Sequence, residues 1–518
     1  MSGGKPMKRI AALVLCATLA AGVLAGCGQR EDPYTPTGDG LYREDETIPV
    51  EESLTKEQVT IPYYPGRSLN PFECTDLTNR TLMSLLYQGL FIQDQDHTTW
   101  PILCESYRVS WDMKTYHFTL AKATFSDGSA VTAEDVKASL KKAGKSPAYE
   151  GRFRQVDQIS VTDRGEVQIK LKVPCESLLT LLDVPIVKAS EVDSARPLGS
   201  GPYIFQPGSP TTLQRRIDWW CNTGLPVTAN RIILMEAENP AQLRDAFEFA
   251  GLSLVSTDPG SQSYTDFHSD YELWECESGI FLYLGCNKNS PVFGNADLRQ
   301  SLVYSIDRDK IVSEIYRGFG TSTVLPAIPG SAYYSTALAK QYTYDSMYLA
   351  QAVEDHREVA ENLVTLLVNG DDGIRLRAAH LIAKDLQTCG LKVTVQALPT
   401  KEYTKALREG AYDLYLGQTR LSANMDLTAF FAKDGNLNVG DMADPATYAL
   451  CLDALANVGN YYNLHQRILE DGQLCPIAFR SYAVYTRRGI FQSLNPSRDH
   501  LFFYHLNRTC DEALVTEE

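Results

Sequence analysis

A polar triplet follows a short strand-like stretch near residue 415. Residues 412–417, YDLYLG, predict a strand, and Gln418, Thr419 and Arg420 come directly after it. In α/β sheets, ligands tend to bind at the carboxyl ends of the strands. Arg420 is a fixed cation whose forked donors suit a carboxylate or a phosphate. The three residues therefore form a candidate ligand site at the mouth of a cleft.

The residues around this triplet predict an α/β region. Residues 362–369 read as a buried strand, 374–390 as an amphipathic helix closed by a glycine, and 391–398 as a second strand. A further helix is expected to start with Thr400 as its N-terminal cap. Strands that alternate with helices pair in parallel through right-handed crossovers.

The first third of the chain has a different pattern. Residues 106–120 and 159–173 each predict a β-hairpin, and Thr132 is expected to cap a helix between them. Further on, Asn295 and Asp307 are start signals for two more helices. An antiparallel α+β part followed by an α/β part predicts two lobes.

Enzyme motifs are missing from the sequence. It contains no H-E-x-x-H, no G-x-S-x-G, no phosphate-binding loop and no C-x-x-C pair. The pair Glu134-Asp135 is typical of a first helical turn and does not indicate acid–base catalysis. We expect no catalytic residue, no cofactor and no metal ligand; a tethered surface hydrolase is the alternative.

The charge of the chain argues against nucleic acid as a partner. Its 518 residues carry a formal net charge of −16, and loss of residues 1–26, which hold three basic and no acidic residues, would bring it to −19. Such a chain repels phosphate backbones.

The N-terminal segment has the layout of an export signal. A basic stub precedes the apolar run 10–26, which is short for a membrane span. Leu24-Ala25-Gly26-Cys27 resembles the bacterial lipobox, which implies cleavage before Cys27 and lipidation of that residue. The protein would then be anchored on the extracytoplasmic face of the cell membrane. The alternative is an ordinary signal peptide with a chance cysteine.

Five blocks, in order, resemble the bacterial extracellular solute-binding proteins of family 5, the oligopeptide, dipeptide and nickel group that serves ABC importers. The resemblance extends from about Pro62 to His505. The blocks are 85–136, 197–208, 298–312, 378–398 and 412–420.

The resemblance implies an α/β, two-lobe, periplasmic-binding-protein-like fold of type II, with a hinge and an extra α/β subdomain in the first lobe. Such lobes close on a ligand between them. The implied parts are a signal peptide at 1–26, a flexible tether at 27–57, lobe I at 58–280 with the subdomain at about 75–196, lobe II at 281–480, and a return to lobe I at 481–518.

The resemblance also implies a function. The protein would be a monomer that captures a peptide, or a peptide-like or anionic small solute, and delivers it to an ABC permease. A surface lipoprotein that reports its ligand to a membrane receptor would use the same fold. Nickel or haem, bound by some relatives, has no supporting histidine or methionine cluster here.

One departure from the family bears on the ligand. In peptide-binding members the corresponding strand leads into G-W-x-x-D, whose acid receives the peptide amine. Here Gln418 replaces the tryptophan and Leu421 the acid. A buried ammonium needs a carboxylate partner. We therefore expect an anionic or amino-blocked ligand held by Arg420, unless Arg420 forms an ion pair with Asp426 or Asp413.

Four more residues are cleft candidates through the resemblance. Tyr403 falls near an aromatic wall of some relatives, and Tyr149 lies in a loop that resembles a lid. Ordinary packing is the alternative for both tyrosines. Thr75 and Asp76 follow a segment that lines the cleft in the family, and Asp76 could replace the missing amine acceptor.

Overall fold

The computed structural model describes residues 59–149, 151–221, 223–491, 494–498, 500–506 and 511–515. All of them belong to one compact unit, Leu54–Glu518. The expected signal peptide, tether and lipidated Cys27 lie outside the described residues. Within these residues, no helix combines the length and apolar character that crossing a bilayer requires.

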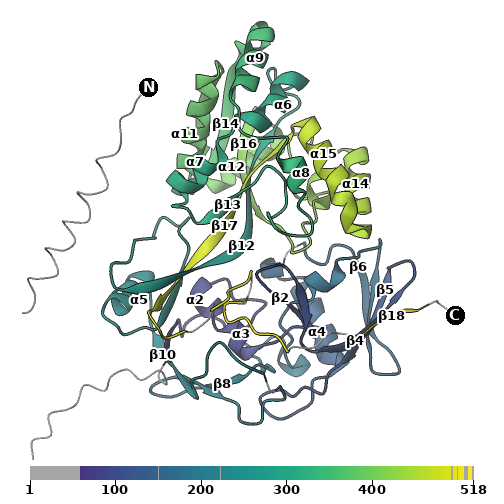
Figure 1. The fold of residues 1–518 in the computed structure, drawn as a ribbon, viewed down its shortest axis with the longest axis vertical. Helices are drawn as coiled ribbons and strands as arrows, with labels where there is room; N and C mark the ends of the chain where they lie inside the picture. Colours follow the sequence, from purple (N-terminus) through teal and green to yellow (C-terminus); the bar gives the residue numbers. More distant parts are fainter. Residues whose placement is uncertain are drawn as a thin grey trace, which may run out of the picture. The chain divides into compact units, whose positions relative to one another are not determined.

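Two long strands form the spine of this unit. β12 (Tyr271–Cys286) pairs antiparallel with β17 (Leu474–Arg487) along most of their length. Figure 1 shows both strands running from the lower part of the ribbon into the upper part. We call the lower part lobe I and the upper part, built from residues 287–473, lobe II. The resemblance to family 5 implies hinge strands near 281–286 and 478–485, and both segments lie within these two strands.

Lobe I contains three smaller sheets. Their strand orders are β1-β10-β9-β8, β18-β4-β5-β7-β6 and β2-β3. The strands are β1 (Val59–Tyr63), β2 (Phe91–Gln93), β3 (Thr99–Pro101), β4 (Cys104–Ser110), β5 (Thr115–Leu120), β6 (Val156–Val161), β7 (Val167–Leu171), β8 (Tyr203–Gln206), β9 (Thr212–Arg215), β10 (Arg231–Glu236) and β18 (Asp511–Val515). The helices are α2 (Leu77–Arg80), α3 (Met83–Leu86), α4 (Ala133–Ala143), α5 (Pro240–Glu248) and the 3₁₀ turns η1 (Pro147–Tyr149), η2 (Leu178–Leu181) and η3 (Ala189–Glu191).

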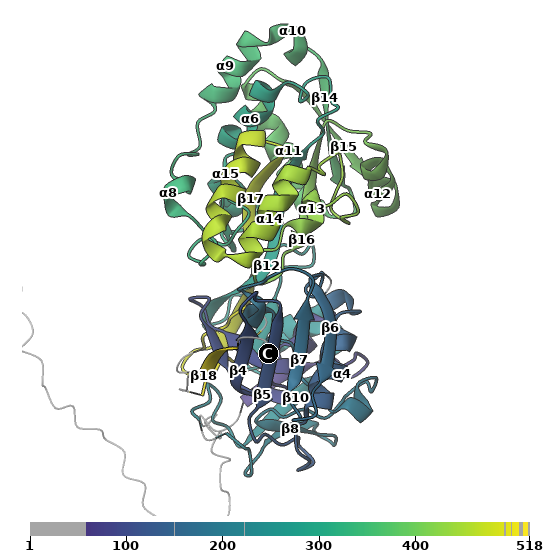
Figure 2. The ribbon, with the colours of Figure 1, turned by 90° about the vertical axis from the view of Figure 1, so that its right-hand side faces the viewer.

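Lobe II is built on the far end of the spine. Its sheet has the order β11-β17-β12-β16-β14-β15, and β13 also pairs with β17. The strands are β11 (Leu254–Thr257, at the lobe I end), β13 (Gly320–Ser322), β14 (Leu363–Asn369), β15 (Lys392–Leu398) and β16 (Leu414–Arg420). The helices are α6 (Ala296–Ser305), α7 (Arg308–Lys310), the π-helical η4 (Ile311–Ile315), α8 (Thr336–Ala339), α9 (Met347–Asp355), α10 (Arg357–Ala360), α11 (Gly373–Thr388), α12 (Thr400–Glu409), α13 (Thr428–Phe431), α14 (Pro445–Ala456), η5 (Val458–Asn460) and α15 (Tyr461–Asp471). Figure 2 shows α13, α14 and α15 in front of this sheet.

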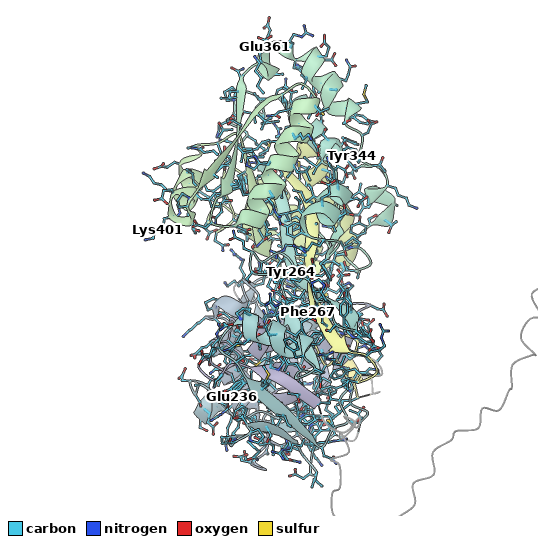
Figure 3. The ribbon with its side chains drawn as sticks, turned by 90° about the vertical axis from the view of Figure 1, so that its left-hand side faces the viewer. Glu236, Tyr264, Phe267, Tyr344, Glu361 and Lys401 are labelled. Atoms are coloured by element: carbon cyan, nitrogen blue, oxygen red, sulfur yellow. The ribbon has the colours of Figure 1, made fainter. Side chains whose placement is uncertain are left out.

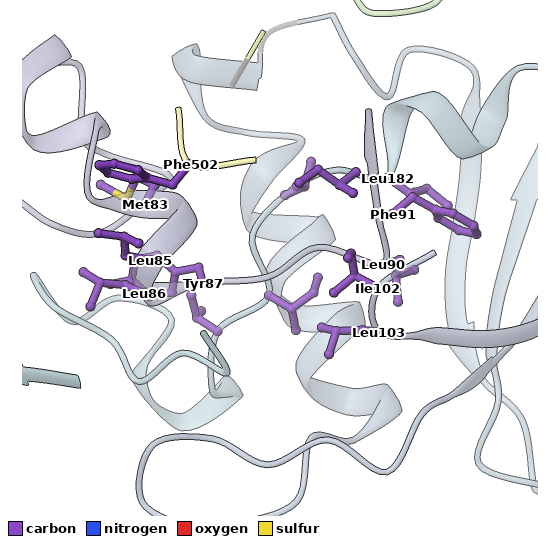
Figure 4. Close-up of a cluster of buried hydrophobic side chains, with 14 of the residues drawn as sticks. Met83, Leu85, Leu86, Tyr87, Leu90, Phe91, Ile102, Leu103, Leu182 and Phe502 are labelled. Carbon is purple, nitrogen blue, oxygen red and sulfur yellow. The ribbon is translucent and has the colours of Figure 1, made fainter. Parts of the chain in front are cut away.

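Each lobe has its own apolar core. The lobe I core gathers α3, the strand around Phe91 and the returning segment around Phe502 (Figure 4). Phe118 of β5 belongs to the same core. In lobe II, one cluster packs β14 and α11 and a second packs β16 against α13 and α15. The lobe I core also includes Ala423 and Leu455 of lobe II, so the two lobes share a small apolar contact.

A loop of residues 258–270 joins β11 to β12 beside the hinge, where Figure 3 labels Tyr264 and Phe267. The hydroxyl groups of Tyr264 and Tyr485 share a hydrogen bond. From lobe II, the Arg317 guanidinium donates to the Asp266 carboxylate at 2.9 Å. The loop thus connects the hinge strand β17 with lobe II.

Most expected elements are confirmed. β4 and β5 form the first hairpin, β6 and β7 the second, and β14 pairs in parallel with both β15 and β16. Thr132 caps α4, and its backbone N–H donates to the Asp135 carboxylate at 2.8 Å.

The start of α12 differs from the sequence prediction. Pro399 is the cap, and Thr400 is the first helical residue. The Thr400 hydroxyl donates to the Asp371 carboxylate at 2.7 Å, a partner 29 positions away in sequence. Local capping signals do not reveal such a distant acceptor.

The lobe II core buries His465 on α15. It is fully buried, and neither ring nitrogen has a hydrogen-bond partner within the part of the chain that the structure describes. Burial lowers the pKa of His465 to about 3. The folded state therefore resists protonation of this ring, whereas the unfolded chain accepts a proton near pH 6.5. The contribution of the neutral His465 ring to the free energy of unfolding is therefore fully present above about pH 6.5, and it is lost as the pH falls from about 6.5 towards 3.

Replacement of His465 should make the free energy of unfolding less dependent on pH below pH 7. Between pH 7 and pH 5 the free energy of unfolding, measured in urea, should fall by about 2 kcal/mol more for the natural protein than for His465→Leu. The control is His380→Gln, which changes an exposed histidine of α11. Equal pH slopes for the natural protein and His465→Leu would contradict the assignment.

Candidate functional site

A pocket of about 140 Å³ lies between the lobes. Lobe I contributes the loop after α4, lobe II contributes the end of β16 and the segment around α13, and the C-terminal return contributes one arginine. Its lining residues are Pro147, Ala148, Tyr149, Gly151, Arg152, Arg154, Thr419, Arg420, Leu421, Ser422, Asp426, Ala429, Asn436, Leu437 and Arg498.

The hinge strand β12 positions Arg420. Arg420 is the last residue of β16 and pairs with Ile280 of β12. Its Nε donates to the Ser278 carbonyl oxygen at 3.0 Å. Because both contacts are to β12, the guanidinium is fixed at the point where the strand passes between the lobes. Thr419 and Arg420, two residues of the sequence-predicted triplet, thus line the pocket.

The acids considered as partners of Arg420 have other contacts. Asp413 accepts hydrogen bonds from the Ser290 hydroxyl and the Thr365 backbone N–H. Asp426 accepts from the Thr428 backbone N–H at 2.8 Å. Asp426 also lines the pocket, and burial raises the pKa of its carboxyl group.

Arg498 enters the pocket from the C-terminal return. Its guanidinium donates to the Leu421 carbonyl oxygen, just beyond β16. The same guanidinium lies against Gly279, which has φ +68°, and a Cβ atom there would stand 2.5 Å from the guanidinium carbon. A side chain at Gly279 would therefore be strained and would also displace Arg498.

The loop after α4 supplies two more arginines. Arg152 forms a buried ion pair with Asp183, and its guanidinium lies 5.0 Å from the centre of the Tyr149 ring. Tyr149 also packs edge-on against Phe72. Arg154 reaches across to lobe II, where it donates to the Asn436 side-chain oxygen at 2.9 Å.

Arginines outnumber acids among the described residues that line the pocket. Among the described lining residues, the arginines are Arg152, Arg154, Arg420 and Arg498, and the one acid is Asp426. Charges of one sign in a cleft with low-dielectric walls focus the field on a ligand of the opposite sign. Arginine pairs with carboxylates through two parallel hydrogen bonds.

Gln418 has a different contact. Its side-chain oxygen accepts from Arg480 Nη1 at 2.8 Å, and Arg480 Nη2 donates to the Asp258 carboxylate at 2.6 Å. Arg480 belongs to β17, so Gln418 connects β16 to a hinge strand.

The remaining candidates lie outside the pocket lining. Tyr403 packs in the lobe II core and donates to the Leu416 carbonyl oxygen at 3.1 Å. Asp76 caps α2 and forms an ion pair with Arg67, while Thr75 is exposed. These contacts support structural roles for Tyr403 and Asp76, and their binding of a ligand stays a prediction.

Sequence reasoning missed Arg152, Arg154 and Arg498. The first two belong to the short run GRFRQ directly after the lid-like loop, and their proximity to Tyr149 was an available signal. Arg498 lies about 80 residues from Arg420, and no local pattern around it indicates a site.

The lobes also touch between the segment after β7 and the residues around the end of α14. The Glu176 backbone N–H donates to the Leu455 carbonyl oxygen at 3.0 Å, and the Glu176 carboxylate accepts from the Val458 N–H at 2.7 Å. Beside them, the Asn424 amide lies 3.8 Å from the Cys175 sulfur. With Arg154, these contacts hold the two lobes together around the pocket.

Comparison with known proteins decides the family. The family model described as bacterial extracellular solute-binding proteins, family 5 Middle, matches residues 98–437. The chain belongs to this family. Proteins of family 5 bind peptides or small solutes extracellularly and work with ABC permeases, so this chain is a solute-binding protein of an ABC transporter.

Individual relatives support the same assignment. The glutathione-binding protein GsiB of Salmonella choleraesuis is 23% identical over 356 residues, which cover 64% of this chain and 67% of that protein. NikA from Brucella suis, solved with Fe(III)-EDTA, superposes with a TM-score of 0.65 at 18% identity and covers 86% of this chain and 98% of its own.

A third relative is AgaA from A. tumefaciens R10, solved in complex with agropinic acid. It has a TM-score of 0.61 at 21% identity and covers 87% of this chain and 99% of its own. These structural likenesses confirm the two-lobe, type II periplasmic-binding-protein fold. The family and these neighbours are binding proteins.

The Glu176 contact generates a prediction about closure. Glu176→Ala removes one hydrogen bond between the lobes, worth about 0.5–1.5 kcal/mol. Deuterium exchange at residues 455–460 should accelerate about twofold to tenfold, because the contact opens more often. Exchange along β12 should stay the same.

Glu105→Ala, at an exposed position of β4, is the matched control. Unchanged exchange at residues 455–460 in Glu176→Ala would show that this contact does not hold the lobes.

Proposed function

We propose that this protein captures a small anionic solute, peptide-like and bearing at least one carboxylate, and delivers it to an ABC importer. The observation that carries the proposal is the set of four arginines from three chain segments that surround the interlobe pocket. Leu421, which lines the same pocket, is the apolar residue at the position of the family's amine-binding acid. The site therefore suits carboxylates better than ammonium groups.

The size of the pocket limits the ligand. Its volume of about 140 Å³ is below the range of roughly 300–1,000 Å³ that is usual for ligand pockets. The pocket is therefore small even for a short peptide, and a longer peptide would require the lobes to separate further. The lobe contacts at Glu176 and Arg154 oppose that separation.

The relatives support an acidic ligand. By their printed names, one binds glutathione, one was solved with agropinic acid and one with Fe(III)-EDTA. All three compounds carry carboxylates. For this chain we propose a ligand that carries a carboxylate, and not one of these particular compounds.

The proposal includes a lipid anchor and a monomeric state. The lipobox at Leu24–Cys27 supports lipidation of Cys27, which would hold the protein beside the permease. The monomeric state is the one that the resemblance to family 5 implies.

Binding measurements test the ligand class. Isothermal titration calorimetry with trialanine, trialaninamide, N-acetyl-trialanine and glutathione should show tighter binding of the acids. Trialaninamide should bind at least tenfold more weakly than trialanine, whereas N-acetylation should have a smaller effect. Arg420→Gln and Arg498→Gln should each weaken acid binding about tenfold or more, because each removes a charge-assisted hydrogen bond.

Arg377→Gln, at an exposed position of α11, is the matched control. Melting temperatures of all variants identify any that fail to fold. Equal affinity for trialanine and trialaninamide, or acid binding that is insensitive to both arginine substitutions, would refute the proposal.

The anchor has its own test. Cys27→Ser in the full-length protein should move it from the membrane fraction to the medium or periplasm. The natural protein should yield an N-terminal peptide with the mass of a diacylglyceryl cysteine. An unmodified Cys27 would rule out lipidation.

A further inference from the structure

A second, smaller pocket continues from the interlobe pocket into lobe I. Its volume is about 30 Å³, and it shares Ala148, Tyr149 and Arg420 with the larger pocket. Because a water molecule needs roughly 10–15 Å³ of such space, this pocket has room for about two water-sized groups. Those are the dimensions of the two oxygens of one carboxylate.

His500 lines this small pocket and has an unused polar atom. The residue is 8% exposed, and its Nε2 has no hydrogen-bond partner among the described residues. Buried polar atoms without a partner are rare in folded proteins, and each one requires an explanation. A ligand atom in the pocket would supply the missing partner.

The acid beside His500 is already engaged. Asp183 Oδ2 lies 3.9 Å from His500 Nε2, which is too far for a hydrogen bond. Asp183 forms its buried ion pair with Arg152, and both side chains are 4% exposed. The ion pair therefore neutralises the acid, and the histidine remains available to a ligand.

The other charged groups of the small pocket are cations. Arg80 and Arg420 line it, and Asp183 is the one acid among its described lining residues. Asp183 is itself paired with Arg152. A carboxylate oxygen can accept from Nε2–H of the imidazole and from the guanidinium groups.

We propose that this small pocket, which Tyr149 also lines, is a carboxylate subsite in which His500 Nε2 and Arg420 bind one carboxylate of the solute. The inference rests on the proposed function and deepens it, because it assigns one acidic group of the ligand to a defined place. His500 then determines specificity. A carboxylate offers an acceptor oxygen to both His500 and Arg420, whereas an amide has one oxygen and would leave one of these two donors without an acceptor.

The test combines substitutions at His500 with amides of the probe. Glutathione has two carboxylates, so its two mono-amides, at the glycine and at the glutamyl end, each remove one. Calorimetry compares the three compounds on the natural protein, His500→Leu and His500→Gln, with His380→Leu as the control. Melting temperatures establish that each variant folds.

His500→Leu should weaken glutathione binding at least tenfold, and His500→Gln, which keeps an N–H donor, by less than threefold. One of the two mono-amides should bind the natural protein and His500→Leu equally, because its missing carboxylate is the one that His500 binds. A crystal structure of the complex should show that carboxylate within hydrogen-bond distance of Nε2.

The subsite is refuted if His500→Leu binds glutathione as tightly as the natural protein does. It is also refuted if the His500→Leu substitution weakens the binding of both mono-amides as much as the binding of glutathione. A crystal structure of the complex with only water in the small pocket would refute it as well. If glutathione does not bind the natural protein, trialanine and trialaninamide replace it in the same comparison. If no carboxylate probe binds the natural protein, the proposed function fails and the subsite fails with it.

Discussion

The antiparallel pairing of β12 with β17 is the interaction on which the rest of the structure depends. Both strands pass between the lobes, and the register of β12 is irregular between Glu277 and Ile280, where the lobes meet. Arg420 is positioned through β16, which pairs with β12 beyond that irregularity, and Arg498 rests on Gly279 within it. Any bend of the hinge therefore changes the distance between the two arginines, which makes the pocket sensitive to closure.

The second constraint is electrostatic. The chain as a whole is acidic, with a formal net charge of −16, yet arginines gather at one interlobe pocket. Buried cations are tolerated when their donors are satisfied. Arg420 donates to the Ser278 carbonyl oxygen and Arg498 to the Leu421 carbonyl oxygen, and these contacts help to fix the direction of each guanidinium group. A solute carboxylate would then meet donors that are already oriented.

The sequence predicted the elements well and the site in part. Period-two patterns located β4 and β5, an apolar run located β14, and a helical pattern located α11. The strand before Arg420 ends at the interlobe pocket. The sequence could not show that Gln418 turns to Arg480, because that contact depends on β17, more than sixty residues later. For the same reason it missed Arg498, whose role comes from the return of the chain. Tyr403, a cleft candidate from the sequence, packs in the lobe II core. An aromatic residue on a helix face lines a cleft only where tertiary contacts leave one beside it, and the local sequence does not show those contacts.

A crystal structure of the protein with a bound carboxylate solute, such as glutathione, tests the central claim most directly. The account predicts density for the solute between the lobes, with its carboxylate oxygens within hydrogen-bond distance of the Arg420 and Arg498 guanidinium groups. Density for the solute elsewhere, for example in the 460 Å³ groove of lobe II beside Tyr344, with the interlobe pocket empty, would contradict it.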